Sequence, residues 1–572
     1  MKKLINALRP TERLIFFICG FLLILSGLYI LDIVNKQYST EIPVRGGSYT
    51  EGIVGYARYI NPVLAYTDAD KDMIHLIFSG LLKPSPEGKL VGDLAESWNI
   101  SEDGLTYSFT LKPGLTFHDG TSLTTDDIAF TIEKMRDPEI KSPKADIWNG
   151  VKVEVLNERD VTFTLKKAYA PFLENLTFGI IPKNSWKSVE SQVFDVNTLN
   201  REPIGSGPYR IKKAHKNSEG IYEYYDLAPF ERYSLGAPYI KNLRVRFFRS
   251  EQEALSAYKQ GRIDALGGID TKSASELKAE GHNVMSTSLP RIFALFLNQS
   301  ESPVLLNKEV RQALNVSVNR DDLIDNVLNS WGTPATGPIP ADLQNATTSE
   351  TLQQTSSTSE EQFIEAGKAI LAEKGWKQNS DGFFEKQVSG STQILRFSIS
   401  TSNAPELKNS AEFLKETWTK LGADVTVEVF EPSDLTQKVI RPRKYQTLLF
   451  GNVIGRDLDL YPFWHSSERN DPGLNTALYT NIKADRALET LRSTSEESKK
   501  LESRQAFQTE MQNDIPAIFL YSPGYIYATD AKIKDASLTN MTSTSERFMN
   551  IEKWYIETER IWNFFLTKGN NQ

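Results

Sequence analysis

Few side chains in this sequence have the type and spacing that chemistry at a site requires. The one cysteine, Cys19, excludes an internal disulfide and a zinc site built on cysteine pairs. The five histidines form neither an H-x-x-x-H nor an H-E-x-x-H motif, and no G-x-S-x-G motif positions a nucleophilic serine. We therefore expect no catalytic residues, no metal site and no cofactor, and a binding protein rather than an enzyme such as a surface hydrolase.

The amino-acid composition indicates a globular protein and argues against nucleic acid as a binding partner. The chain has 572 residues, of which 40% are hydrophobic and 24% charged, which is typical of a globular protein. Its formal net charge is -8, and no long run of lysine and arginine is present, so nucleic-acid binding is not expected. The length is too great for one ordinary domain and predicts two lobes, each with its own core.

The N-terminal region has the pattern of a membrane segment. Residues 14–31 contain no charge, and Asp32 ends this run. At about 1.5 Å per residue the run would span roughly 27 Å as a helix, close to the hydrocarbon thickness of a bilayer. The residues that precede it include Lys2, Lys3, Arg9 and Arg13. This charge bias predicts that the N-terminal end stays in the cytoplasm and that the bulk of the chain is extracytoplasmic, at the cell surface or in the periplasm.

Three fates of this segment are compatible with its composition: a retained anchor, a cleaved signal peptide, or a core helix. No A-x-A cleavage site follows the run, and the run is longer than the usual signal-peptide core. Phe16, Phe17 and Ile18 precede Cys19, which argues against lipidation there because lipoprotein signals need a small residue at that place. We expect a retained single-pass helix, followed by a short polar tether over residues 36–45.

The rest of the chain alternates between strand and helix patterns. Apolar residues recur at every second position in residues 105–111, 151–155, 161–165 and 425–429, which predicts strands with one buried face. Thr124 is a good N-cap with Asp127 three residues on, and Asp137-Pro138 ends the helix that follows. Helical faces are also expected in residues 310–317 and 323–328. Residues 347–361, rich in Ser, Thr, Gln and Glu, are expected to form a surface insertion. The mixture indicates an α/β class.

Several short motifs recur in an order that resembles a known family. Residues 78–82 read F-S-G-L-L, residues 93–98 D-L-A-E-S-W and residues 117–120 F-H-D-G. Further along come I-G-S-G-P-Y at 204–209 and E-V-R-Q-A-L at 309–314. Together they resemble family 5 of the bacterial extracellular solute-binding proteins, the peptide- and nickel-binding group. The resemblance covers about residues 45–530.

This resemblance implies a fold and a division of the chain. The expected fold is α/β and two-lobed, like a periplasmic binding protein of type II in the large cluster C, with a hinge and one preceding transmembrane helix. The expected division is a cytoplasmic stub and anchor (1–35), lobe I (36–290, with 72–200 as a subdomain), lobe II (291–514) and a C-terminal return to lobe I (515–572).

The resemblance also implies a function. It identifies the chain as the extracellular substrate-binding component of an ABC importer, a monomer that captures oligopeptides between its lobes and delivers them to permease subunits. Two alternatives stay open: a different ligand, such as a nickel chelate or a sugar, and a surface protein that senses or chaperones peptides without a permease.

Members of the family hold the peptide amine with a carboxylate in a loop of the second lobe. Residues 451–462 correspond to that loop, with Asp457 as the first choice and Asp459 as the second. The alternative for Asp457 is a solvated turn carboxylate paired with Arg456. Asn452, Tyr461 and Trp464 belong to the same region and are expected to line the ligand cleft, although aromatic residues after a proline are more often core.

Other candidate ligand contacts also rest on the resemblance. Tyr56 and Tyr59 lie near the loop after the first strand, with ordinary strand packing as the alternative. Asn298 follows an inter-lobe strand, where an amide at the strand end is the plainer interpretation. Ser79 and Gly80 lie where the backbone is expected to approach the ligand. The remaining candidates are weaker: His118 is expected to be structural, and His465 alone is weak evidence for a metal chelate.

Overall fold

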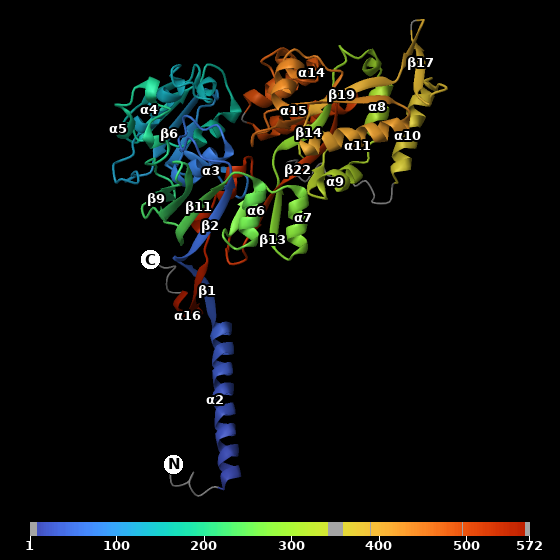
Figure 1. Ribbon diagram of the computed structural model, residues 1–572. Coiled ribbons are helices and arrows are strands. Elements are labelled where there is room, and N and C mark those ends of the chain that lie inside the picture. Colours follow the sequence, from blue (N-terminus) through green and yellow to red (C-terminus); the bar gives the residue numbers. More distant parts are fainter. Residues whose placement is uncertain (1–8, 341–358, 389, 495, 567–572) are drawn as a thin grey trace.

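Two α/β lobes lie side by side above one long helix in this computed structural model (Figure 1). The structure describes residues 9–340, 359–388, 390–494 and 496–566. Most of the predicted insertion at 347–361 lies outside these ranges, and its last residues, from Glu360, begin α10 (Glu360–Glu373).

The N-terminal helix is α2 (Pro10–Tyr38). Of the described residues, those from Leu14 to Tyr38 form the one helix that is long and apolar enough to cross a membrane, and no part of its apolar window is buried by the rest of the chain. Its length and composition fit a membrane span and a signal sequence equally. A buried core helix, the third possibility, does not fit this exposure.

The predicted tether is instead regular structure. α2 continues to Tyr38, and β1 (Ser39–Val44) begins at the next residue. β1 pairs antiparallel with β23 (Glu557–Trp562), near the C-terminus, so that Ser39 lies opposite Trp562 (Figure 1). The prediction of a tether was wrong because a partner strand more than 500 residues away satisfies the backbone of this polar segment, and local sequence does not show such a partner.

A sheet of 12 strands runs through both lobes. In spatial order it contains β20 (Asp424–Phe430), β19 (Arg396–Ser402), β21 (Thr447–Val453), β14 (Arg291–Leu297), β22 (Ala517–Thr529), β12 (Ala265–Gly267), β2 (Gly46–Val54), β11 (Ile240–Phe248), β10 (Tyr222–Pro229) and β9 (Tyr209–Lys216). Two further strands, β13 (Asn283–Ser288) and β15 (Gly332–Pro334), pair with β22.

Two segments connect the lobes. β22 pairs with β14 over its first half and with β12 and β13 over its second half, so it belongs to both lobes. The chain also crosses from β13 to β14 through Leu289 and Pro290. Two adjacent crossing strands of this kind form a hinge about which lobes can close.

Lobe I contains a subdomain with its own sheet, in the order β5 (Ala95–Ile100), β6 (Thr106–Leu111), β8 (Asp160–Thr164) and β7 (Lys152–Val155). Alternation of apolar residues predicted strands at 105–111, 151–155 and 161–165, and β6, β7 and β8 confirm these three predictions. The helix expected after Thr124 is α4 (Thr125–Arg136), and the Asp127 carboxylate accepts the Thr124 backbone N–H at 2.9 Å. Other elements of lobe I are α3 (Asp68–Ile77), β3 (Leu82–Pro84), β4 (Leu90–Gly92), α5 (Lys183–Trp186), α6 (Glu251–Lys259) and α7 (Thr271–Ala279).

Lobe II packs helices on both faces of its part of the sheet, in two core clusters. Trp418, fully buried on one of these helices, donates its indole N–H to the Leu314 carbonyl at 3.1 Å and ties two helices together. The helices are α8 (Lys308–Val316), α9 (Arg320–Leu328), α10, α11 (Pro405–Leu421), α13 (Tyr461–Trp464), α14 (Ile482–Ser493) and α15 (Glu497–Asp514), and a small sheet contains β16 (Lys377–Gln378), β17 (Phe384–Val388) and β18 (Ser391–Ile394).

The chain returns to lobe I after β22. There the short helix η10 (Thr544–Phe548) presents Arg547, whose guanidinium contacts the carboxylates of Glu51 at 2.8 Å and Asp72 at 2.7 Å. All three side chains are buried, so the pairing connects the returning segment to β2 and α3 inside the core. The predicted boundaries at residues 36, 291 and 515 stay a prediction.

Candidate functional site

Two strands end at the junction between the lobes. β21 runs antiparallel to β14, which is antiparallel to β22, so β21 points toward lobe I. β2 is parallel to β12, which is antiparallel to β22, so β2 points toward lobe II. Each strand carries an exposed apolar side chain at its carboxyl end, Val453 on β21 and Val54 on β2. The space between the lobes is therefore bordered by the carboxyl ends of one strand from each.

The edge of β21 nearest the junction is open. β14 pairs with β21 along its whole length, from Thr447 to Val453. On the other side β19 pairs only with Thr447 and Leu448. In the described part of the chain no strand pairs with residues 449–453 on that side. The Leu449 carbonyl accepts the Thr401 hydroxyl of β19 at 3.0 Å, so the backbone groups of residues 450–453 are those available to a further extended chain.

The loop after β21 carries the predicted carboxylates. It spans residues 454–460 and leads into α13, and Leu458 adopts a left-handed conformation with φ of 53°. The backbone N–H of Leu458 donates to the Gly455 carbonyl at 3.0 Å, which makes a tight turn. Because of this turn, the side chains of Arg456, Asp457 and Asp459 have different neighbours although the three residues are close in sequence.

Arg456 reaches across to lobe I. Its guanidinium forms ion pairs with Glu174 at 3.2 Å and with Glu546 at 2.7 Å. It also donates to the Asn540 carbonyl at 2.8 Å. Glu174 lies in the short helix η2 (Ala170–Thr177), and Glu546 lies in the returning segment. The ion pairs of Arg456 are therefore with lobe I, not with the neighbouring Asp457.

Asp459 is already fully engaged. Its carboxylate accepts a hydrogen bond from Arg492 on α14 at 2.9 Å and from the Tyr169 hydroxyl of lobe I at 3.4 Å. The Arg492 guanidinium lies over the Tyr461 ring at 4.3 Å and near the Tyr169 ring at 5.1 Å. Asp459, Arg492 and Tyr169 thus form a second contact between the lobes.

Asp457 differs in that its carboxylate forms no hydrogen bond and no ion pair with any of the residues that the structure describes. It borders a narrow groove of about 30 Å³ between the lobes, opposite Ala170 and Pro171 of lobe I. Lys500 and Arg504 line the same groove. Asp457 retains exposed surface, yet displacement of water by the surrounding protein raises its pKa to about 6, against the opposing effect of Lys500 and Arg456.

Three of the predicted aromatic residues are half-buried near the junction. Tyr56, two residues after the end of β2, contacts the Phe247 ring at 6.3 Å between centroids. Tyr59 lies against Tyr66 and under the guanidinium of Arg58. Tyr461 stacks on His465 at 4.0 Å and under Arg492. These three rings are positioned by neighbouring side chains and retain exposed surface.

The structure places other predicted residues inside the protein. Trp464 is fully buried against Phe296 and Phe519 in the lobe II core. Asn298 is also fully buried, and its side chain donates to the Arg443 carbonyl at 3.1 Å and accepts the Ser300 N–H at 3.0 Å. These environments match the structural alternatives, because both polar groups of Asn298 are satisfied by the protein itself.

Ser79 and Gly80 belong to the interior of lobe I. Ser79 is buried, and its hydroxyl donates to the Ser206 carbonyl at 3.3 Å. A Cβ atom at Gly80 would lie 2.8 Å from the backbone of Thr177 and Phe178, so this glycine permits close packing of two segments. Asn452 is mostly buried within β21. None of these positions reaches the groove at Asp457.

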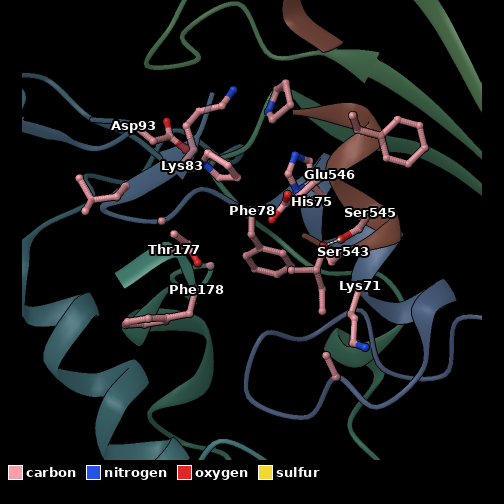
Figure 2. A pocket seen from close by; sticks show the side chains of 18 of the residues that line it. Lys71, His75, Phe78, Lys83, Asp93, Thr177, Phe178, Ser543, Ser545 and Glu546 are labelled. Atoms are coloured by element: carbon pink, nitrogen blue, oxygen red, sulfur yellow. Dashed lines mark hydrogen bonds between the residues drawn. The ribbon is translucent and has the colours of Figure 1, made fainter. Parts of the chain in front are cut away.

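A separate cavity of about 270 Å³ lies within lobe I (Figure 2). Figure 2 shows His75 beside Glu546 and Ser545 of the returning segment, with Thr177 and Phe178 on the other side. Its charges are largely paired: Lys83 contacts Glu552 at 3.3 Å, and Glu546 contacts Arg456. Burial lowers the pKa of His75 to about 3, so this histidine is neutral. Of the predicted site residues only Gly80 lines this cavity.

Sequence reasoning missed the residues of lobe I that face the loop. Tyr169, Glu174 and Glu546 meet Asp459 and Arg456 only through the packing of the lobes. Arg492 was missed as well, because one arginine on a polar helix carries no local signal. Among the described residues no group of three or more His, Cys, Asp or Glu side chains could hold a metal ion.

Comparison with known proteins agrees with this architecture. The family described as bacterial extracellular solute-binding proteins, family 5 (middle region), matches residues 89–472. The oligopeptide-binding protein AppA of Bacillus subtilis is 25% identical over 545 residues, which are 91% of this chain and 94% of that protein. The nickel-binding periplasmic protein of Escherichia coli is 28% identical over 386 residues, 66% of this chain and 70% of that one.

Solved structures show the same fold. The structure of Bacillus subtilis AppA in complex with a nonapeptide aligns with a TM-score of 0.66 and covers 90% of this chain and 100% of AppA. NikZ of Campylobacter jejuni in complex with Ni(L-His) is 26% identical, with a TM-score of 0.67, and covers 89% of this chain and 99% of NikZ.

The fold and the loop between the lobes define a two-lobed solute-binding protein. The chain belongs to family 5 of the bacterial extracellular solute-binding proteins.

Proposed function

We propose that this chain captures oligopeptides outside the cytoplasm and delivers them to the permease of an ABC importer. Asp457 is the observation that carries the proposal: it is an unpaired carboxylate in the loop that follows a strand whose edge is open. An extended peptide has a backbone that pairs with a strand edge and an N-terminal ammonium that needs a carboxylate. This one region supplies both.

The peptide backbone would pair with residues 450–453 of β21, and the amine would lie at Asp457. Recognition through the backbone leaves the ligand side chains outside the strand ladder, which predicts broad sequence tolerance. The exposed Val453 and Val54 border this space from the two lobes and offer apolar contact to ligand side chains.

Binding and lobe closure are coupled at this loop. Arg456 and Asp459, on either side of Asp457, contact Glu174, Glu546 and Tyr169 of lobe I. A ligand ammonium at Asp457 would therefore sit in the contact between the lobes and favour the closed arrangement over the open one.

We also propose that α2 is retained as a single-pass anchor and that the lobes are extracytoplasmic. Its exposure and the basic residues before it support this assignment. Confinement at the membrane raises the effective concentration of the receptor at its permease without any additional contact. The protein acts as a binding protein rather than an enzyme.

The relatives support the ligand class and also provide the alternative. AppA of Bacillus subtilis is named an oligopeptide-binding protein and was solved with a nonapeptide, whereas NikZ was solved with Ni(L-His).

Native mass spectrometry of the full chain, purified in detergent, tests the ligand class. A ladder of co-purified short peptides is the expected result. A single adduct that contains nickel or a sugar, and no peptide, would replace the oligopeptide assignment while leaving the fold unchanged.

The role of Asp457 is tested by Asp457→Asn in calorimetric titrations with a peptide identified by that experiment. Its affinity should fall about 10- to 100-fold, which corresponds to about 1.4–2.8 kcal/mol. Asp381→Asn, in an exposed turn of lobe II, is the matched control and should bind as the unmodified protein does.

An N-acetylated form of the same peptide allows a double-mutant cycle, in which the protein carboxylate and the peptide amine are removed singly and together. Acetylation should weaken binding to the unmodified protein and have little further effect on Asp457→Asn, because the same ion pair is already lost. Additive losses would show that another group holds the amine.

A further inference from the structure

The last described residues present a cluster of exposed aromatic side chains. Trp562 is 46% exposed, Phe564 67% and Phe565 65%, and the two phenylalanine rings contact each other at 5.6 Å between centroids. Trp562 ends β23, and the phenylalanines lie on the short helix α16 (Asn563–Leu566). We call these three residues the C-terminal aromatic cluster. Large apolar side chains gathered on a surface indicate contact with another surface.

The pairing of β1 with β23 places this cluster where α2 ends. Ser39, the residue after α2, lies opposite Trp562, and the Thr40 hydroxyl donates to the Asn563 side-chain oxygen at 2.6 Å. Figure 1 shows α16 beside the upper end of α2 and below both lobes. Tyr38, the last residue of the helix, is also exposed.

The polarity of this region changes along its length. The apolar run of α2 stops at Asp32, which pairs with Lys36 at 2.7 Å. At about 1.5 Å per residue, the helix from Asp32 to Tyr38 covers roughly 10 Å, slightly more than the roughly 5–8 Å of headgroup region on one side of a bilayer. Farther from α2, toward the lobes, the paired strands β1 and β23 carry charged side chains. Among them are Glu41 and Arg560, which lie 3.9 Å apart. The aromatic cluster therefore lies between the apolar helix and the charged part of the paired strands.

We propose that the C-terminal aromatic cluster lies in the outer interface of the lipid bilayer. Tryptophan and other aromatic side chains concentrate at this level, where an apolar ring meets a hydrated boundary. The inference rests on the proposed retention of α2, because that helix sets the height of the bilayer beside Trp562. Helix α2 and the C-terminal aromatic cluster then both contact the membrane, and the paired strands β1 and β23 restrict how far the lobes can tilt above it.

The depth of the cluster can be measured in the full chain, purified from membranes and reconstituted in phosphatidylglycerol–phosphatidylethanolamine vesicles. A nitroxide is attached at Phe565→Cys in a Cys19→Ser background. Matched labels at Gly20→Cys, within α2, and at Leu156→Cys, 66% exposed on lobe I, define the membrane and water limits. Collision rates with oxygen and with a water-soluble nickel complex report the depth of each label.

We expect the Phe565 label to be protected from the nickel complex at least fivefold relative to the Leu156 label. Equal exposure of these two labels, with the Gly20 label immersed, would overturn the aromatic cluster proposal and leave the anchor intact. Loss of the Gly20 label from the mature protein by cleavage would instead overturn the anchor, and the inference with it.

A second measurement tests the consequence for orientation. Energy transfer from a dye at Leu156→Cys to acceptor lipids should give a broader distribution when Trp562, Phe564 and Phe565 are all replaced by Ser. Replacement of the exposed Leu306 and Val196 by Ser is the control for loss of apolar surface. An unchanged distribution in the triple variant would contradict the proposed contact.

Discussion

Asp457 and Asp459 are separated by one residue, but their surroundings differ. Asp459 accepts hydrogen bonds from Arg492 and Tyr169, whereas Asp457 has no such partner within the described residues. A partly desolvated, unpaired carboxylate destabilises the empty protein when it is ionised and becomes favourable when a cation arrives. This difference supports Asp457 as the first choice for the amine anchor and Asp459 as the second.

The raised pKa of Asp457 predicts a pH-dependent effect on stability. Its folded pKa of about 6 lies above the usual value of 3.8, so the folded state is relatively stabilised below the unfolded pKa and loses this contribution as pH rises through 6. Asp457→Asn should therefore raise the melting temperature of the ligand-free protein at pH 7.5 and leave it nearly unchanged at pH 4. Calorimetry checks this, and a lower melting temperature at pH 7.5 would show that Asp457 makes a stabilising contact.

At the scale of elements, β21 provides an open edge over residues 450–453, next to the loop with Asp457. Half of the backbone N–H groups of an added strand point toward the strand it joins. N-methylation at alternate positions of a bound peptide should therefore weaken binding about tenfold or more for one set of positions and much less for the other. Titration with the two sets of methylated peptides measures this, and equal losses would argue against strand addition.

The return of the chain to lobe I depends on a buried charge cluster. Arg547 compensates both Glu51 and Asp72 in the core, so its removal leaves two buried carboxylates without a cation. Arg547→Met should lower the free energy of unfolding by about 3–5 kcal/mol. Arg244→Met, which breaks an exposed pair with Asp226, should cost less than about 1 kcal/mol. Urea unfolding compares the two, and equal effects would contradict a central role for Arg547.

At the scale of the whole molecule, Arg456 connects the lobes. Arg456→Gln leaves Glu174 and Glu546 of lobe I without their shared cation, which should favour open arrangements and weaken ligand affinity about tenfold. Small-angle scattering should show a larger radius of gyration for the variant without ligand. Arg441→Gln, which affects only a pair within lobe II, is the control, and equal radii for the two variants would exclude a role of Arg456 in closure.

Burial raises the pKa of Glu174 to about 7, although Arg456 lowers it, and this adds a pH dependence to the same contact. Below pH 7 Glu174 becomes increasingly protonated, and its attraction to Arg456 declines. Closure of the lobes should therefore weaken from pH 8 to pH 6 in the unmodified protein. The same scattering measurement on Glu174→Gln should show no such trend from this residue.

The sequence by itself determined the local elements and the family. Alternation of apolar residues predicted β6, β7, β8 and β20, and Thr124 with Asp127 predicted the start of α4, because side-chain periodicity and capping depend only on near neighbours. The motifs between residues 78 and 314 were sufficient to identify the solute-binding family and hence the two-lobed fold.

Tertiary structure alone decided which candidate side chains are buried and which are unpaired. Trp464 and Asn298 proved to be core residues, and Asp457 proved to be unpaired while Asp459 was not. The contacts of Arg456 with Glu174 and Glu546, and of β1 with β23, join residues that lie from 90 to more than 500 positions apart. No local pattern encodes such contacts, because they arise only when packed lobes and the returning chain bring distant segments together.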